Sequence, residues 1–304
     1  MPTPVDILIL GAGWTSTFLI SLCRSRHFSY AATTRSGDNG TFKFIFDQNN
    51  DDEPSQLDQF RHLPDATTVL ITFPITQQGA SGRLVRLYYE TRVDSGRASF
   101  IQLGATSIWD TPSENLPPVQ ASRFQWQDRN SPYVFNDRAK AEDELLALSP
   151  AIQTTVLNLA GLWGGKRDTR NWVGRVAPTK DALRNKGSIH MIHGHDVARA
   201  ILAVHAQFPR SAGQRWLLTD GRVYDWWDLA SAWGLPTPKV DDDGADPDAA
   251  KSPQPTWVLE LMLETGVRGL PRDTHLLGRA LDSREFWAAF NLMPKRARLD
   301  KADL

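Results

Sequence analysis

The stretch that decides the fold is Val5–Ser16, which reads VDILILGAGWTS. Its first part, Val5–Leu10, is an apolar run with the length of a buried strand, and Thr17–Ser25 continues with the pattern of a helix. Between them, Gly11 permits a tight turn and Gly13 lets the backbone approach a phosphate group. The N-terminus of the helix offers unpaired N–H groups and a favourable dipole to such an anion. The stretch therefore predicts a turn that binds the pyrophosphate of a dinucleotide.

The third position of the glycine pattern usually holds a glycine that packs the helix against the strand, and in this chain it is Ser16. The pattern is therefore degenerate, and its place after the first strand of an α/β chain is what gives it weight. An ordinary glycine-rich turn without a ligand is the alternative interpretation. The predicted phosphate-binding residues are Gly11, Gly13, Trp14, Thr15 and Ser16.

Short apolar runs continue along the chain and alternate with stretches of helical periodicity. Near-continuous apolar strands separated by helices are typical of a parallel sheet that is covered on both faces. The sequence thus predicts an α/β fold with a doubly wound parallel Rossmann sheet. The further strands are expected at Tyr30–Thr34, Phe42–Asp47, Val69–Phe73, Ser99–Leu103, Thr154–Leu159 and Gln214–Thr219.

The second half of the chain is expected to add a smaller, mainly helical part on the substrate side of this sheet. We place the dinucleotide-binding domain at residues 1–165 and the smaller part at 166–304, with about 188–220 returning to the sheet. Lys239–Pro255 is rich in Asp, Pro and Ala, which predicts an exposed loop. The expected helices are Gly82–Val93, Arg138–Leu148, His195–Gln207, Leu259–Glu264, Leu276–Ala280 and Ser283–Phe290.

The end of the second strand indicates which dinucleotide is bound. NAD sites commonly place Asp or Glu there, about 20 residues past the glycines, whereas a nearby Arg suits the 2′-phosphate of NADP. This chain has Thr34, Arg35 and Ser36 at that point and no carboxylate among them. Arg35 can hold a phosphate through two hydrogen bonds, while Thr34 and Ser36 donate further ones. The sequence predicts NADP as the cofactor, with a solvated loop arginine as the alternative.

Composition and charge narrow the classes of partner. The 304 residues carry 34 basic and 35 acidic side chains, so no strong field favours nucleic acid or an anionic membrane. No apolar run approaches the ~20 residues that cross a bilayer. Cys23 is the only cysteine, which excludes an internal disulfide. We expect a soluble, cytoplasmic monomer or homodimer that acts on a small molecule and binds neither nucleic acid nor membrane.

The glycine turn and the segments after it resemble the extended and atypical short-chain dehydrogenase/reductase family, especially its YeeZ-like branch. The similarity includes Asp47 at the end of the third strand and, more loosely, Leu103–Trp109, Leu159–Gly164 and Ile192–Ala200. The resemblance implies a Rossmann sheet of about seven strands with a small C-terminal region on the substrate side. It also implies that Asp47 contacts the adenine of the cofactor.

Members of this family that transfer hydride use a Tyr and a Lys four residues apart on one helix, and a Ser at the end of the fifth strand. The Lys lowers the pKa of the Tyr, which exchanges a proton with the substrate oxygen that the Ser polarises. Here Lys140 matches and could hold the nicotinamide ribose, but Asn136 stands at the Tyr position and Ala105 at the Ser position. The candidate catalytic residues are therefore Lys140 and three possible replacements for the missing hydroxyls, Thr106, Ser107 and Tyr133.

A group of histidines, His190, His193 and His195, precedes Asp196 where a strand meets a helix. Their spacing does not place them on one face of a helix, so we expect no metal site here. In the resembling family this junction is structural, which implies that Asp196 caps the helix and that His193 supports the sheet.

In a doubly wound sheet, ligands bind at the carboxyl ends of the strands. One crevice is therefore expected to gather the glycine turn and several later segments, namely Arg35, Phe73, Pro74, residues 105–107 and residues 136–140, with Trp109 and Trp163 facing it. Two functions stay open at this point. One is an NADP(H)-dependent oxidoreductase, or a related isomerase or lyase, that acts on a small organic molecule. The other is a non-catalytic sensor or scaffold that binds NADP(H).

Overall fold

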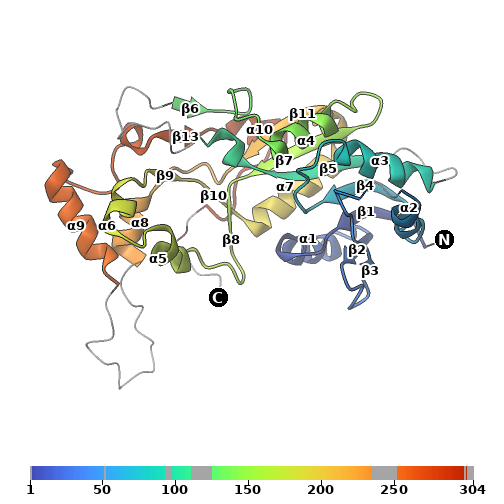
Figure 1. Ribbon diagram of the computed structural model, residues 1–304, viewed down its shortest axis with the longest axis horizontal. Helices are drawn as coiled ribbons and strands as arrows, with labels where there is room; N and C mark the ends of the chain where they lie inside the picture. Colours follow the sequence, from blue (N-terminus) through green and yellow to red (C-terminus); the bar gives the residue numbers. More distant parts are fainter. Residues whose placement is uncertain are drawn as a thin grey trace, which may run out of the picture.

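A seven-stranded parallel sheet forms the centre of the computed structural model, which describes residues 2–50, 53–92, 98–110, 125–233, 252–297 and 299. The strand order is β11-β7-β5-β4-β1-β2-β3, so the chain runs outward from β1 to one edge and then crosses back to the other side (Figure 1). This order confirms the predicted doubly wound α/β fold. The strands are β1 (Val5–Leu10), β2 (Tyr30–Thr34), β3 (Phe42–Lys43), β4 (Ala66–Ile71), β5 (Ser99–Ala105), β7 (Thr154–Leu159) and β11 (Gln214–Leu218).

Both faces of this sheet are buried, as the continuous apolar run of β1 predicts. Ile7 and Ile9 point into one hydrophobic cluster and Leu8 and Leu10 into the other, because successive side chains of a strand face opposite ways. The first cluster lies under α1 (Trp14–Ser25), α7 (Gly194–Ala206) and α10 (Arg284–Ala289). The second lies under α2 (Glu53–Arg61), α3 (Ala80–Glu90) and α4 (Asp137–Leu146). The two layers of helices leave the carboxyl ends of the strands as the open edge.

Cys23 lies in α1 with no exposed surface and packs in the first hydrophobic cluster. Burial, with a smaller contribution from the nearby Asp6 carboxylate, raises the pKa of its thiol to about 11. The thiol therefore stays protonated at neutral pH and is a poor nucleophile.

The third strand is shorter than the sequence predicts, since β3 ends at Lys43 and not at Asp47. The side-chain amide of Gln59 in α2 accepts from the Ile45 N–H at 2.7 Å and donates to the Ile45 carbonyl at 3.1 Å. The backbone groups that a longer strand would offer to the sheet are thus satisfied by a side chain. The other strands of the sheet match their predicted ranges to within a few residues, as do the covering helices except α2, for which the sequence predicts no helix.

A smaller part of the chain lies beyond the carboxyl edge of the sheet, at the end of the molecule opposite the N-terminus (Figure 1). Its centre is the buried indole of Trp227, which donates to the Leu183 carbonyl at 2.8 Å and lies 3.9 Å from the guanidinium of Arg272. Its helices are α5 (Val173–Val176), α6 (Lys180–Arg184), α8 (Trp226–Trp233) and α9 (Gln254–Thr265). The smaller part also contains two short 3₁₀ turns, Thr169–Trp172 and Thr274–Leu277. Two further 3₁₀ turns lie in the main part: Thr106–Trp109 follows β5, and Phe208–Arg210 follows α7.

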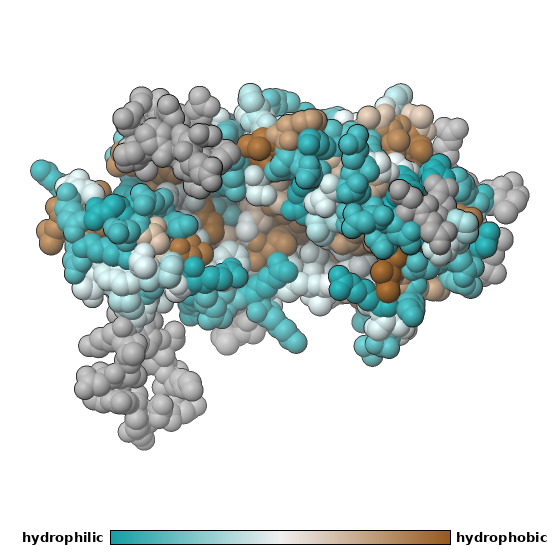
Figure 2. Space-filling view, in the orientation of Figure 1, coloured by the Kyte–Doolittle hydropathy of each residue, from teal (hydrophilic) through white to brown (hydrophobic). Residues whose placement is uncertain are grey.

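Three two-stranded sheets connect this smaller part to the main sheet. They pair β8 (Gly161–Trp163) with β10 (Met191–His193), β9 (Ser188–Ile189) with β12 (Tyr224–Asp225), and β6 (Gln125–Gln127) with β13 (Arg279–Leu281). Within the described ranges, no helix is both long enough and apolar enough to cross a membrane. Figure 2 shows a mainly hydrophilic face on which hydrophobic residues form small, scattered groups.

Two predictions for the C-terminal region are wrong. The helix expected at Leu276–Ala280 is a short turn followed by strand β13, because Gly278 has a φ of +85° and turns the chain out of the helix. The predicted loop Lys239–Pro255 extends too far along the chain, because α9 begins at Gln254 and has a proline in its first turn. Residues 239–251 of that predicted loop lie outside the described residues.

Candidate functional site

The glycine turn between β1 and α1 has a backbone that only glycine adopts easily at its first position. Gly11 has a φ of +89°, and a Cβ atom there would lie 2.8 Å from Thr72 Oγ1. The Gly11 N–H donates to Thr33 Oγ1 at 2.9 Å, and the Thr72 hydroxyl donates to the Gly11 carbonyl. Two neighbouring strands thus fix the turn, because Thr33 belongs to β2 and Thr72 follows β4.

The second glycine of the turn leaves open space. Gly13 is the N-cap of α1, which begins at Trp14, three residues earlier than predicted. No side chain caps this helix and its first turn carries no acidic residue, so its first N–H groups remain available to an anion. A Cβ atom on Gly13 would meet only the Gly11 carbonyl oxygen, at 4.0 Å. The turn therefore fits a pyrophosphate, which needs close approach to this backbone.

Ser16 and Thr15 stand in the first turn of α1, and both are buried. The Ser16 hydroxyl has no hydrogen-bond partner among the described residues, although Ser16 is only 2% exposed. A buried unpaired hydroxyl is costly, which favours a partner that comes from outside the chain.

Trp14 links the glycine turn to the segment after β8. Its indole N–H donates to the Gly164 carbonyl at 3.1 Å, and the guanidinium of Arg167 lies 4.4 Å from its ring. Trp14 therefore holds the turn in place and brings a cation to the start of α1. The sequence gives no signal for Arg167, because the contact joins segments about 150 residues apart.

At the end of β2, Arg35 is exposed and makes no ion pair or hydrogen bond with any described residue. Thr34 beside it accepts from the Gly37 N–H at 2.9 Å and shares a hydrogen bond with the Thr41 hydroxyl at 2.7 Å. Ser36 is also exposed. The Thr34 contacts hold this loop, and the binding of a 2′-phosphate by Arg35 stays a prediction.

Three further residues predicted to bind the cofactor lie near the same edge. Phe73 stacks on Phe46 with ring centroids 6.2 Å apart, and its ring lies 3.1 Å from the position that a Gly11 Cβ would take. Pro74 is exposed, and its carbonyl accepts from the Gln48 amide at 2.8 Å. Asp47 is exposed, and its carboxylate accepts from the Asn49 N–H at 3.0 Å. The contact of Asp47 with adenine and the contacts of Phe73 and Pro74 with the cofactor stay predictions.

The start of α4 differs from a helix that carries a Tyr–Lys pair. Asn136, at the Tyr position, is the N-cap of α4, and its side-chain oxygen accepts from the Ala139 N–H at 2.9 Å. Lys140 is 45% exposed, and its ammonium group lies 3.1 Å from the Asp137 carboxylate. The helix begins where the Tyr would stand, so Asn136 has a structural task. A role for Lys140 at the ribose stays a prediction.

Tyr133 has a partner inside the protein. Its hydroxyl donates to the Asp143 carboxylate at 2.8 Å, and its ring lies 4.8 Å from the guanidinium of Arg215. Burial raises the pKa of Tyr133, and the hydrogen bond to Asp143 raises it further. This phenol is therefore a weaker acid than usual, which is the opposite of what a proton-exchanging Tyr requires.

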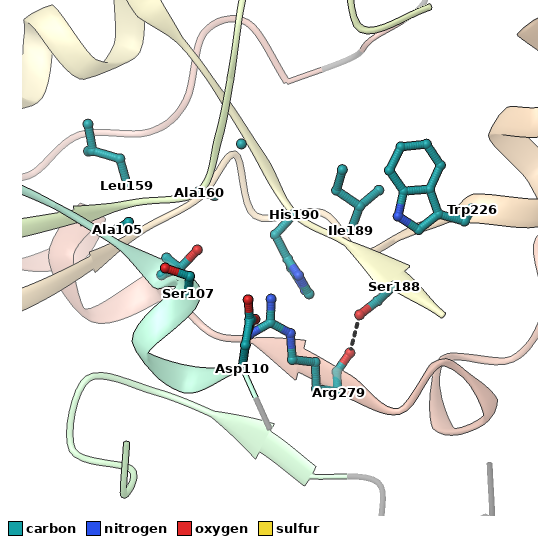
Figure 3. A pocket seen from close by; sticks show the side chains of 12 residues that line it. Ala105, Ser107, Asp110, Leu159, Ala160, Ser188, Ile189, His190, Trp226 and Arg279 are labelled. Carbon is teal, nitrogen blue, oxygen red and sulfur yellow. Dashed lines mark hydrogen bonds and ion pairs between the residues drawn. The ribbon is translucent and has the colours of Figure 1, made fainter. Parts of the chain in front are cut away.

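A pocket of about 380 Å³ opens at the carboxyl ends of β5 and β7. The main sheet contributes Ala105, Thr106 and Ser107, and the smaller part contributes Ser188, His190 and Arg279 from the opposite side (Figure 3). Neither the Thr106 nor the Ser107 hydroxyl is hydrogen-bonded to a described residue. The structure thus brings two of the candidate catalytic residues into one pocket, whereas Tyr133 and Lys140 do not line it.

His190 and Arg279 give this pocket its polar character. The Leu281 N–H donates to His190 Nε2 at 3.0 Å, and His190 is only 3% exposed. Burial, together with the charge of Arg279, lowers the pKa of His190 to about 3, so the imidazole is neutral at physiological pH. Arg279 forms an ion pair with Asp110, which also lines the pocket. The sequence indicates His190 only as a member of a histidine group. No local pattern in the sequence indicates that Arg279 lies in a pocket.

The tryptophan that lines the pocket is Trp226, and the prediction for Trp109 and Trp163 is wrong. Trp109 is 1% exposed and donates to the Ser131 carbonyl at 3.1 Å. Trp163 is buried against the ring of His193, with centroids 4.6 Å apart. Both follow strands of the main sheet, yet their indoles turn into packed clusters.

The helix after the histidine group is capped by a different residue from the one that the resemblance implies. His193 is the N-cap of α7, and its Nδ1 accepts from the His195 N–H at 3.0 Å. Asp196 is fully buried, pairs with Arg199 at 2.7 Å and accepts from the N–H of Lys295 at 3.0 Å, so it anchors the C-terminal segment. Within the described ranges, no three His, Cys, Asp or Glu side chains are grouped in a way that could hold a metal ion.

Comparison with known proteins finds similarity in structure but not in sequence. No family model matches the sequence, and no curated protein matches it. A short-chain dehydrogenase/reductase superfamily protein from Agrobacterium tumefaciens with bound NAD is 13% identical, with a TM-score of 0.58 over 97% of this chain and 94% of that chain.

Two further solved structures are similar to the same extent. The yeast methylglyoxal/isovaleraldehyde reductase in complex with NADPH is 13% identical, with a TM-score of 0.57 over 96% of this chain and 94% of that chain. The Thermus thermophilus UDP-glucose 4-epimerase in complex with NAD is 12% identical, with a TM-score of 0.56 over 97% and 96%. Membership of the YeeZ-like branch stays a prediction. The chain has the fold shared by short-chain dehydrogenase/reductase and NAD(P)-dependent epimerase/dehydratase structures.

Proposed function

We propose that this protein is an NADP(H)-dependent oxidoreductase, or a related isomerase or lyase, that acts on a small organic molecule. The observation that carries the proposal is the uncapped N-terminus of α1 with open space beside Gly13, at the same edge of the sheet as the unpaired Arg35. Solved structures with the same fold were obtained with NAD or with NADPH, which supports a nicotinamide dinucleotide as the cofactor.

The residues of the turn would hold the cofactor by its phosphates. The first N–H groups of α1 would bind the pyrophosphate, and Arg167 would add positive charge from the segment that Trp14 anchors. Arg35 would pair with the 2′-phosphate, and the exposed hydroxyl of Ser36 would donate to it. The Thr34 hydroxyl is left out of this assignment, because the Thr41 hydroxyl donates to the Asp38 carbonyl and Thr34 therefore donates its own proton to Thr41. When bound, NADP(H) supplies or accepts the hydride.

The pocket would hold the substrate. Its volume of about 380 Å³ lies in the range of small-molecule sites. Thr106 and Ser107 stand at the end of β5, and their hydroxyls would orient a substrate oxygen there. Tyr133 is left out of this assignment because its hydroxyl donates to Asp143.

The test is a titration of the purified protein with NADPH and with NADH, followed by intrinsic tryptophan fluorescence. We expect tighter binding of NADPH, and a loss of about tenfold to a hundredfold in NADPH affinity in Arg35→Ala, because one charge-assisted contact is removed. NADH binding should not change in this variant. Arg26→Ala, an exposed arginine at the far end of α1, is the matched control. A preference for NADH that Arg35→Ala leaves unaltered would contradict the NADP assignment.

A second candidate function is a non-catalytic sensor or scaffold that binds NADP(H). It is favoured by the engagement of Tyr133 with Asp143 and of Lys140 with Asp137, which leaves no Tyr–Lys pair. The two candidates differ in turnover. NADPH absorbance followed with a panel of aldehydes and ketones should fall for the oxidoreductase and stay constant for the sensor.

A further inference from the structure

The imidazole of His190 is in a defined chemical state. It lies between β9 and β10, is only 3% exposed, and accepts the Leu281 N–H at Nε2, at 3.0 Å. A backbone N–H is always a donor, so Nε2 must carry the lone pair. The proton of the neutral ring is therefore on Nδ1, and His190 is a hydrogen-bond donor at that atom.

This Nδ1–H has no hydrogen-bond partner within the part of the chain that the structure describes. Buried donors in folded proteins are rarely left unpaired. His190 lines the pocket, and Figure 3 shows its ring on the side of Arg279 and Asp110. The unpaired donor thus lies on a residue that lines the pocket.

The surroundings of His190 restrict what the ligand can be. Arg279 lies beside it and forms an ion pair with Asp110, which also lines the pocket. The positive charge of Arg279 is therefore already compensated. A carboxylate ligand would place a second negative charge near Asp110, whereas an uncharged oxygen would accept from His190 without that repulsion.

We infer that His190 Nδ1–H donates a hydrogen bond to an uncharged oxygen of the substrate, a carbonyl or an alcohol oxygen, and that this residue selects such substrates over carboxylates. The identity of the ligand as a substrate depends on the proposed function. Since the ring stays neutral, His190 positions the oxygen and polarises it, and it does not transfer a proton. Thr106 and Ser107 line the same small pocket and would contact the same ligand.

Two substitutions separate this role from a structural one. His190→Gln keeps an acceptor near the position of Nε2 for Leu281 but removes the donor. His190→Asn keeps a donor near the position of Nδ1 but leaves Leu281 without its acceptor. We expect His190→Gln to keep the melting temperature and to bind acetophenone about tenfold more weakly. His190→Asn should melt at a lower temperature and bind acetophenone within about threefold of the wild type.

The wild-type protein provides a readout that does not depend on how these variants fold. In protein labelled with 15N-histidine, the ring nitrogen signals of His190 should report the Nδ1–H form, unchanged from pH 5 to 8. Acetophenone and 1-phenylethanol should shift the Nδ1–H signal, and benzoate should bind at least about tenfold more weakly. These titrations use the protein without cofactor, so a failure to bind NADPH would leave them readable.

Three results would overturn the inference. An Nε2–H or doubly protonated ring in this pH range removes the donor on which it rests. Benzoate that binds as tightly as acetophenone contradicts the selection for uncharged oxygen. Acetophenone affinity that is unchanged in a folded His190→Gln, or no shift of the His190 signal with any of the three probes, assigns the residue to packing alone.

Discussion

The β1–α1 turn and the corner where β5 faces α4 lie at the same edge of the sheet. They differ in whether their polar groups are paired within the protein. In the turn, α1 has no side-chain cap and Arg35 nearby has no described partner. In the corner, Asn136 caps α4, Lys140 pairs with Asp137 and Tyr133 donates to Asp143. The turn leaves its binding groups free for a ligand, whereas the corner uses its groups for its own stability. The predicted phosphate-binding turn thus keeps unpaired polar groups, although the polar groups of the neighbouring corner pair with one another.

The corner depends on a buried ion pair. Arg215 is 6% exposed and contacts the carboxylates of Glu142, which is 3% exposed, and of Asp143, at 2.8 Å. It also donates to the Asn158 side chain at 3.0 Å. These contacts join α4 to β7 and β11 and hold Asp143 where Tyr133 reaches it.

The largest effect is expected for Arg215→Met. This change leaves the buried carboxylate of Glu142 without its counter-charge, so the free energy of unfolding should fall by about 3–5 kcal/mol. Urea denaturation measures it, and NADPH affinity of the folded protein should stay the same. Arg284→Ala, which removes an exposed partner of Asp282, is the control and should leave the urea midpoint unchanged. A loss of less than about 1 kcal/mol in Arg215→Met would mean that the corner is not held by this pair.

The next largest effect is expected for Gly11→Ala. The substitution puts a Cβ atom 2.8 Å from Thr72 Oγ1 on a backbone with a φ of +89°. We expect a loss of about 2 kcal/mol in the free energy of unfolding, together with loss of measurable NADPH binding, because the turn must shift. Gly79→Ala, which has a similar φ of +81° but open space around it, separates the backbone effect from the steric clash. Equal losses in the two variants would show that the fit against Thr72 is not important.

A smaller effect is expected for Tyr133→Phe. The hydrogen bond to Asp143 is lost, so stability should fall by about 1 kcal/mol in thermal unfolding. Any turnover of carbonyl substrates should persist, because the hydroxyl is committed to Asp143 and does not reach the pocket. Abolished turnover with little loss of stability would identify Tyr133 as the proton donor after all and would break the comparison.

The smallest effect is expected for Lys140→Ala. Its ammonium group is half exposed, and its pair with Asp137 should contribute no more than about 0.5 kcal/mol. NADPH affinity should change by less than about threefold if the lysine has no contact with the ribose. A much larger drop in affinity would support the ribose role that the resemblance implies, and would show that the side chain turns away from Asp137 when cofactor binds.

The sequence predicted the parts of this molecule that depend on local pattern. The continuous apolar run of β1 and the glycines after it predict a buried strand and a phosphate-binding turn, because both features depend on neighbouring residues. The wall of the pocket that His190 and Arg279 form could not be predicted in this way. His190 meets Leu281 across 91 residues of sequence, and Arg279 pairs with Gln125 of β6 across 154 residues. Such pairings leave no periodic signal in either segment.

The wrong predictions have the same origin. The sequence predicts a third strand of six residues, Phe42–Asp47, but β3 ends at Lys43. The Gln59 side chain in α2 accepts the hydrogen bond of the Ile45 N–H, which a longer strand would donate to the sheet. Trp109 and Trp163 follow the right strands, yet the fold turns their rings inward. In each case a tertiary contact determines the structure, although the local sequence pattern favours another one.

The central claim, that the β1–α1 turn is a dinucleotide site, is tested most directly by calorimetric titration of Gly13→Ala with NADPH. The added Cβ atom meets only the Gly11 carbonyl oxygen, at 4.0 Å, so the protein should melt within about 2 °C of the wild type. The methyl group would occupy the space that a pyrophosphate needs, so NADPH affinity should fall at least about tenfold. Wild-type affinity in this variant, or no binding of NADPH by the wild type, would contradict the claim.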